Sequence, residues 1–207
     1  MAILLPINPK YPEPRKIRKC VEVLKNGGVI AYPTGTVYGF GCDLYNKKAI
    51  EKVYQIKGAN RKKPFSFLCP DLSNISIYAA LTDKAYRIMK RLVPGPYTFI
   101  LEATKEVPKL VQSKRKTVGI RVPDHPIAQA LLRELGSPII STSARRAGEE
   151  IINDPREIAK RFPAVDIVID GGLEGLIPST VISIDSDGNI EIIREGAGDH
   201  ELIYQFM

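Results

Sequence analysis

The order of helical and strand patterns constrains the fold of this chain more than any other feature. Apolar residues recur at helical spacing in several segments, and short β-branched or aromatic runs separate these segments. Near the C-terminus two strand patterns instead flank the turn sequence Asp187-Gly188. Alternation predicts helices packed on a sheet, and the hairpin adds antiparallel pairing. We therefore expect an α/β (α+β) fold with a twisted, mixed parallel and antiparallel sheet, flanking helices and a concave cavity where strand ends converge.

Capping and turn residues predict where the elements begin and end. Pro14 suits the first turn of a helix, and Thr82 suits an N-cap. The helix after Thr82 is expected to carry Tyr86, Met89 and Leu92 and to end at Pro94-Gly95. The expected helices cover roughly 14–26, 47–57, 83–93, 127–135 and a segment that starts at 154, and the expected strands cover 29–32, 65–69, 97–103, 117–122, 139–140, 166–170, 180–185 and 189–194.

Length and composition predict one domain in the cytoplasm. The chain has 207 residues and no internal repeat, so we expect a single domain over 1–207 with its core at about 16–199. No apolar run approaches the ~20 residues of a membrane helix, and residues 1–10 lack a signal-peptide pattern. The three cysteines are scattered, which argues against a structural zinc site or a disulfide framework. We expect no metal bound by protein side chains and no contact with a membrane.

The net charge of +7 gives information about partners. A basic surface attracts phosphates and polyanions such as RNA, and the alternative is that abundant lysine serves solubility. Charge alone favours the second interpretation over the first.

Four polar clusters lie at the ends of predicted strands, where ligands bind in α/β proteins. In the first, at 32–41, Thr34, Thr36 and Tyr38 stand among glycines, and a structural turn is as good an interpretation as a binding loop. The second, at 57–64, carries four cations, among them Lys57 and Arg61. It is either a clamp for a triphosphate or a solvated helix end whose lysines favour the helix dipole.

The other two clusters combine hydroxyl groups with arginine. Ser141, Ser143 and Arg145 belong to the segment 141–148, for which the alternative is a polar loop with local hydrogen bonds. Ser179 and Thr180 should lie near Arg194, because the last two strands are expected to pair. If the four clusters serve one function, folding must gather them around one anion-binding hollow.

The ordered set of motifs resembles the YrdC-like family over roughly residues 16–199. The motifs are Gly28-Val-Ile-Ala-Tyr-Pro-Thr34, Val37-Tyr-Gly39, Gly41-Cys-Asp43, Pro94-Gly-Pro96, Gly119-Ile-Arg-Val-Pro123, Ser141-Thr-Ser143, Pro178-Ser-Thr-Val181 and Arg194-Glu-Gly196. The resemblance implies a twisted mixed sheet with a basic concave surface. It also implies an L-threonylcarbamoyladenylate synthase activity, in which ATP, L-threonine and bicarbonate or CO₂ give pyrophosphate and a carbamoyl adenylate for adenosine 37 of tRNA.

Carried over by position, the resemblance assigns roles to individual residues. Thr34, Tyr38 and Ser179 would line the threonine and carbonate pocket, with Ser179 also adjoining the nucleotide, and Lys57 and Arg61 would act on the phosphates. The nucleotide would be held by Arg121, Ser141, Ser143, Arg145, Thr180 and Arg194. Mg²⁺ would be carried on the phosphates of ATP, and other tRNA-modification proteins would be partners.

The chain departs from the synthase pattern at several positions, and its segments at 65–72, 97–101, 104–108 and 114–117 are similar to the YciO branch of the family. Gly35, Ala59, Asn60, Leu68 and Arg145 replace, in that order, an acidic residue, an arginine, a proline, a histidine and an asparagine. The alternative function is therefore a diverged protein that binds double-stranded RNA or tRNA, with Lys114, Arg115 and Lys116 as the RNA-binding cluster. A third alternative is a nucleotide-binding regulator without catalytic activity.

Overall fold

The computed structural model describes residues 2–58 and 65–206. The strands are β1 (Ile3–Pro6), β2 (Ile30–Pro33), β3 (Tyr38–Asp43), β4 (Ser66–Leu68), β5 (Tyr97–Glu102), β6 (Thr117–Arg121), β7 (Ile139–Ser143), β8 (Ile167–Asp170), β9 (Thr180–Ile184) and β10 (Ile190–Arg194). The helices are α1 (Pro14–Lys25), α2 (Lys47–Lys57), α3 (Asp83–Leu92), α4 (Pro126–Leu135), α5 (Pro155–Arg161) and α6 (Glu201–Tyr204), with a 3₁₀ turn η1 (Ile75–Ile77). Within the described ranges, no helix is both long and apolar enough to span a bilayer.

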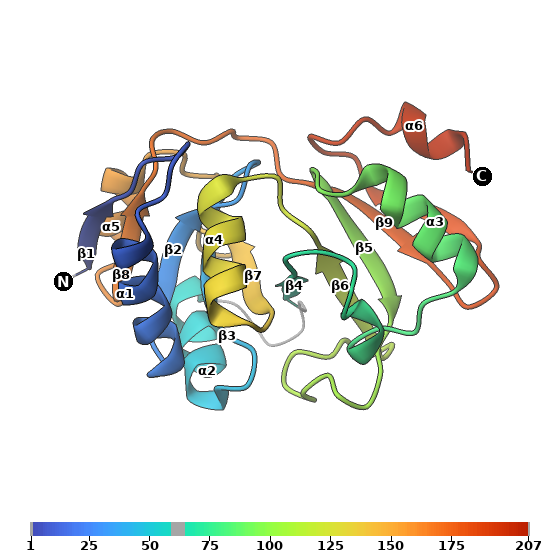
Figure 1. Cartoon of the computed structure of the whole chain (residues 1–207), viewed down its shortest axis with the longest axis horizontal. Helices are drawn as coiled ribbons and strands as arrows, with labels where there is room; N and C mark the ends of the chain where they lie inside the picture. Colours follow the sequence, from blue (N-terminus) through green and yellow to red (C-terminus); the bar gives the residue numbers. More distant parts are fainter. Residues whose placement is uncertain (1, 59–64, 207) are drawn as a thin grey trace.

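The ten strands form one mixed sheet in the order β1-β8-β2-β3-β7-β4-β6-β5-β9-β10 (Figure 1). The pairs β1/β8, β2/β8, β4/β6 and β5/β9 are parallel, and the pairs β2/β3, β3/β7, β4/β7, β5/β6 and β9/β10 are antiparallel. The mixed sheet with flanking helices confirms the predicted fold class. Asp187-Gly188 forms the turn between β9 and β10, as expected, with Gly188 at φ +81°.

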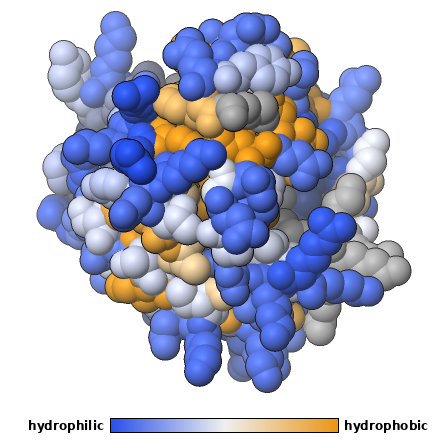
Figure 2. Space-filling view, turned by 90° about the vertical axis from the view of Figure 1, so that its right-hand side faces the viewer, coloured by the Kyte–Doolittle hydropathy of each residue, from blue (hydrophilic) through white to orange (hydrophobic). Residues whose placement is uncertain are grey.

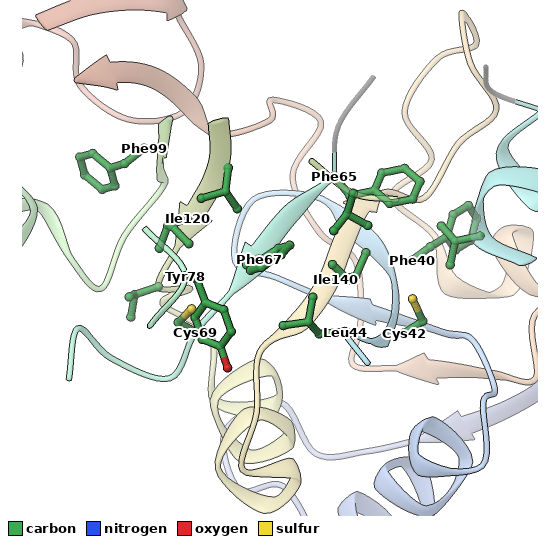
Figure 3. Packing of buried hydrophobic residues seen from close by; sticks show 14 of the residues in the cluster. Phe40, Cys42, Leu44, Phe65, Phe67, Cys69, Tyr78, Phe99, Ile120 and Ile140 are labelled. Atoms are coloured by element: carbon green, nitrogen blue, oxygen red, sulfur yellow. The ribbon is translucent and has the colours of Figure 1, made fainter. Parts of the chain in front are cut away.

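Successive residues of the central strands enter two different hydrophobic cores because side chains alternate across a sheet. Ile30 and Tyr32 pack with α1 and α4 on one face, whereas Val29 and Ala31 belong to the core on the other face. That second core extends through Phe40, Phe67 and Phe99, which come from strands in both halves of the sheet (Figure 3). Burial on both faces makes the central part of the sheet a rigid base for the loops at its strand ends.

Helix caps are formed by the residues that the sequence indicates. Thr82 accepts a hydrogen bond from the backbone N–H of Ala85 at 3.1 Å, and Asp154 accepts one from Arg156 at 2.8 Å. Tyr86 belongs to α3, as expected, and its side chain is 41% exposed. The buried face of α3 instead runs through Ala85, Ile88, Met89 and Leu92. The small Ala85 occupies the core-facing position of the first turn.

Two strands were not expected from the sequence, β1 and β3. In β3, Gly39 and Gly41 resemble flexible loop residues, but they pair with β2 on one side and β7 on the other. A Cβ atom at Gly41 would lie 2.6 Å from the Tyr32 ring and 2.9 Å from Ile139. These glycines therefore allow neighbouring side chains to pack closely inside the sheet, and they are not part of a mobile ligand-binding loop.

Candidate functional site: a basic cavity

A cavity of about 340 Å³ opens where the central strands end. It is lined by residues of α2, β3, β4, β5, β6, β7, β9 and β10 and of the loops next to them. The lining contains Thr34, Lys57, Arg121, Ser141, Ser143, Arg145, Ser179 and Arg194, which represent all four polar clusters. The prediction that these clusters share one hollow is confirmed.

Positive charge is concentrated in this cavity. Five cationic residues line it, because Arg146 joins Lys57, Arg121, Arg145 and Arg194, and the described part of the lining includes no aspartate or glutamate. Burial lowers the pKa of Arg194, and the nearby charge of Arg145 lowers it further. Several cations around one space, with no carboxylate among the described lining residues, are typical of a site that binds an anion.

Arg121 is buried beneath the loop at residues 34–36 and is 6% exposed. Its guanidinium donates to the hydroxyl oxygen of Thr36 at 2.8 Å, to that of Thr34 at 3.3 Å and to the carbonyl oxygen of Thr34 at 2.9 Å. It also donates to the carbonyl oxygen of Gly95 at 3.3 Å. Burial lowers its pKa to about 10. Arg121 thus holds the hydroxyls of two threonine residues that line the cavity.

Arg194 and Ser179 form the opposite wall. Arg194 donates to the carbonyl oxygen of Ser179 through Nη2 at 2.7 Å and through Nε at 3.1 Å. The Ser179 hydroxyl lies 2.8 Å from the hydroxyl of Thr98 on β5. Thr180 is fully buried, outside the lining, and its hydroxyl donates to the carbonyl oxygen of Gly198 at 2.6 Å. Thr180 therefore anchors this wall from behind.

Lys57, at the end of α2, makes hydrogen bonds to the backbone of a third wall of the cavity. Its ammonium donates to the carbonyl oxygen of Ser143 at 2.8 Å and to that of Arg145 at 3.1 Å. The guanidinium of Arg145 donates to the carbonyl oxygen of Glu149 at 2.6 Å. On the floor, Ser141 accepts a hydrogen bond from the Tyr32 hydroxyl at 3.1 Å. Arg61, Ala59 and Asn60 lie outside the described residues.

Five of the predicted site residues lie outside the described cavity lining, and one of them is Thr180, as described above. Tyr38 is fully buried, and its hydroxyl donates to the carbonyl oxygen of Gly172 at 2.7 Å. Lys114, Arg115 and Lys116 are exposed in the loop between β5 and β6. The cavity therefore does not include the cluster predicted to bind RNA, and Tyr38 contacts the connection after β8.

The structure adds lining residues that the sequence did not single out. Thr98 is a small hydroxyl residue between the aromatic residues Tyr97 and Phe99 of β5, and that was the available signal. Leu68, at the position of a histidine in the synthase pattern, gives part of the lining an apolar character. Gly35 has φ +82°, and a Cβ atom there would lie 2.6 Å from the carbonyl oxygen of Asp124, so this loop requires glycine.

The described residues contain no group of three His, Cys, Asp or Glu side chains that would hold a metal ion. The cysteines Cys20, Cys42 and Cys69 are buried free thiols away from the cavity lining. Burial raises the pKa of Cys20 and of Cys69 to about 12. These thiols are core residues rather than nucleophiles.

Comparisons with known proteins agree on one family. The Sua5/YciO/YrdC family model, described as "Telomere recombination", matches residues 22–196. The uncharacterized protein YciO of Escherichia coli (strain K12) is 46% identical over 196 residues, which cover 93% of this chain and 95% of that protein. The threonylcarbamoyl-AMP synthase of Nitrosococcus oceani is 35% identical over 158 residues, covering 75% of this chain and 85% of the synthase.

Solved structures have the same fold. The crystal structure of E. coli YciO superposes with a TM-score of 0.92 at 43% identity and covers 98% of this chain and 99% of its own. The structure of P. abyssi Sua5 complexed with L-threonine has a TM-score of 0.93 at 27% identity. That match covers 100% of this chain and 61% of the Sua5 chain.

Proposed function

This chain belongs to the Sua5/YciO/YrdC family, and from that membership we propose that it is a nucleotidyltransferase of the threonylcarbamoyl-AMP synthase type. The proposed substrates are ATP, L-threonine and bicarbonate or CO₂. The products would be pyrophosphate and threonylcarbamoyl-AMP, which would serve tRNA modification in the cytoplasm together with other tRNA-modification proteins.

The observation that carries this proposal is the cavity in which Lys57, Ser143, Ser179 and Arg194 meet. A triphosphate needs several fixed cations, and five cationic residues line this one space. The threonine complex of P. abyssi Sua5, which has the same fold, supports an amino acid as the second ligand.

The proposed reaction has two bond-forming steps. The ammonium group of threonine first loses a proton, and the neutral amine nitrogen attacks the carbon of bicarbonate, so that a carbon–oxygen bond breaks and the carbamate forms with loss of water. A carbamate oxygen then attacks the α-phosphorus of ATP, the bond between the α-phosphorus and the bridging oxygen breaks, and pyrophosphate leaves. In this scheme Lys57, Arg145 and Arg194 neutralise the phosphates, while the hydroxyls of Thr34 and Ser179 orient the acid. The protein would supply orientation and charge without a covalent intermediate.

Mg²⁺ fits this scheme as a companion of ATP. The ion prefers oxygen ligands and usually keeps contact with substrate phosphates. The described lining offers hydroxyl oxygens and no carboxylate, so the phosphates would be its anionic ligands.

The proposal predicts that pyrophosphate is released only when ATP, threonine and bicarbonate are all present. We would measure release with a coupled colorimetric assay, and with each substrate omitted in turn. Release that is indifferent to threonine would disprove the substrate assignment.

Variants of two lysines of α2 sharpen this test. Lys57→Met is expected to lower turnover at least about tenfold, because a charged hydrogen-bond donor is typically worth ~1.5–3 kcal/mol. The matched control is Lys47→Met, since Lys47 is exposed on the same helix. Equal losses in both variants would contradict the role of Lys57.

A second candidate function is binding of tRNA or double-stranded RNA. The exposure of Lys114, Arg115 and Lys116 in one loop favours it, because exposed adjacent cations are free to meet phosphates. This function would use a surface outside the cavity lining and is compatible with the first.

A further inference from the structure

The connection from β8 to β9, residues 171–178, crosses between the two halves of the sheet (Figure 1). We call it the strap. Its first residues are held by Tyr38, whose hydroxyl accepts from the Gly171 N–H at 3.2 Å and donates to the Gly172 carbonyl at 2.7 Å. Its last residue, Pro178, leads into Ser179 and lines the cavity with it. The strap therefore joins the wall at residues 34–36 to the wall at Ser179.

Along the strap, apolar side chains are exposed and an acidic side chain is buried, which is the reverse of what their polarity predicts. Leu173 is 71% exposed and Leu176 is 56% exposed, whereas the side chain of Glu174 between them is 10% exposed. A carboxylate loses hydration when it is buried and requires compensating hydrogen bonds. The position of Glu174 therefore reflects specific contacts rather than chance.

Those contacts are made to the outer side of the loop at residues 34–36. The backbone N–H of Gly35 donates to Oε2 of Glu174 at 2.9 Å. Burial raises the pKa of Glu174, and the backbone N–H groups of Gly35 and Thr34, the charge of Arg121 and the N–H of Thr36 oppose this effect. Successive backbone N–H groups that converge in this way form a nest for an anion. The carboxylate of Glu174 fills that nest.

His125 supports the carboxylate from a second direction. Its Nε2 lies 3.6 Å from Oε1 of Glu174. Its Nδ1 accepts a hydrogen bond from the N–H of Ile127 at 3.2 Å, so the neutral ring carries its proton on Nε2, toward the carboxylate. The carboxylate is thus enclosed by groups that stabilise its charge.

The loop at 34–36 lies between two opposite charges. On its inner side Arg121 donates to the Thr36 hydroxyl at 2.8 Å, and on its outer side is Glu174. The strap also touches the loop directly, since a Cβ atom at Gly175 would lie 2.5 Å from the carbonyl oxygen of Thr36. Small shifts of the strap would therefore move the hydroxyls that face the cavity.

We propose that Glu174 is a positioning residue for the acid substrate: its carboxylate fills the nest of residues 34–36 and sets the Thr34 and Thr36 hydroxyls at a fixed distance from Ser179. The inference rests on the proposed function, in which this part of the cavity holds threonine. Glu174 lies outside the cavity lining and acts through the loop.

The test uses Glu174→Gln, which keeps the shape and removes the charge, with Glu174→Asp as the variant that keeps the charge. Amide hydrogen exchange at 34–36, measured by NMR, reports on the loop without any substrate. We expect at least tenfold faster exchange in Glu174→Gln. The KM for threonine should rise at least tenfold, and the KM for ATP should stay within twofold. Glu174→Asp should recover part of both effects.

Leu173→Ala is the matched control, because this exposed side chain lies next to Glu174 on the strap. It should leave exchange and both KM values unchanged. Unchanged exchange in Glu174→Gln would overturn the proposal, and so would an equal rise in both KM values together with a fall in Tm. If the unaltered protein releases no pyrophosphate, the proposed function fails separately. In that case, faster amide exchange confined to residues 34–36 in Glu174→Gln would still support the positioning role of Glu174. Unchanged exchange at these residues would overturn it.

Discussion

Two arginines of the cavity, Arg121 and Arg194, have different uses although both were expected to hold the nucleotide. Arg121 makes its hydrogen bonds to the loop at residues 34–36 and to Gly95, so it stabilises the loop that lines the cavity. Arg194 holds the Ser179 carbonyl, and its pKa is lowered by burial and by Arg145. An anion in the cavity would relieve the repulsion between Arg194 and Arg145. Ligand binding at this site should therefore be coupled to stability.

Pyrophosphate is the simplest probe of this coupling. Arg194→Gln is expected to weaken pyrophosphate binding at least about tenfold, since a hydrogen bond to a charged group is worth ~1.5–3 kcal/mol. Isothermal titration calorimetry measures the change directly. Arg156→Gln is the control, because its side chain is 78% exposed, and it should bind as the unaltered protein does. Equal affinity in all three proteins would contradict an anion site at Arg194.

Individual site residues could be predicted where they stand at strand ends. Lys57 and Ser143 end regular segments and Ser179 directly precedes one, and the rule that ligands bind at strand ends brings them together. Glu174 could not be predicted, because its local sequence is a loop with exposed leucines and its partner loop lies about 140 residues away in the chain. Hydrogen bonds over such separations depend on the register of the whole sheet.

Among the secondary-structure elements, helices could be predicted from the sequence more readily than strands. A helix such as α3 carries its own cap, Thr82, and an apolar period of several turns. The strand β3 carries glycines at alternate positions, which remove the side-chain pattern by which strands are recognised. Its neighbours β2 and β7 supply the reason for those glycines, namely the close approach of Tyr32 and Ile139.

This close approach predicts a large cost for a single methyl group in β3. Gly41→Ala should lower the free energy of unfolding by about 3 kcal/mol, because overpacking a fixed core typically costs ~1–3 kcal/mol and the contacts here involve a ring between strands. Gly136→Ala, at the end of α4, has open space but φ +74° and should cost about 1 kcal/mol. Urea denaturation would compare them. A smaller loss for Gly41→Ala than for Gly136→Ala would contradict tight packing at β3.

For the molecule as a whole, the charge of +7 is spread over more than the cavity. Figure 2 shows that the face toward the C-terminal half is largely hydrophilic, with hydrophobic surface visible between polar side chains. Exposed apolar residues in that half include Ile193 on the edge strand β10 and Leu202 on α6. Polyanion binding would therefore depend on the placement of charge as well as on its total.

The RNA-binding hypothesis can be tested at this scale. Replacing Lys114, Arg115 and Lys116 by alanine should weaken binding of an RNA duplex and flatten its salt dependence, by about 0.9 in the slope of log K against log salt for each lost phosphate contact. A variant with Arg15, Arg18 and Lys19 replaced removes the same charge from the exposed face of α1. Fluorescence anisotropy at several salt concentrations would distinguish them. Affinity that does not change between low and moderate salt would exclude this function.

The first and last strands of the chain are the opposite edges of its sheet, and the cavity lining reaches the last strand only at Arg194, the end of β10. The two termini consequently lie at opposite ends of the molecule (Figure 1). A fusion partner or surface tether attached at the N-terminus would lie at the β1 edge, which contributes no residue to the described cavity lining. Joining the termini to each other, by contrast, would require a linker long enough to pass along the entire width of the sheet.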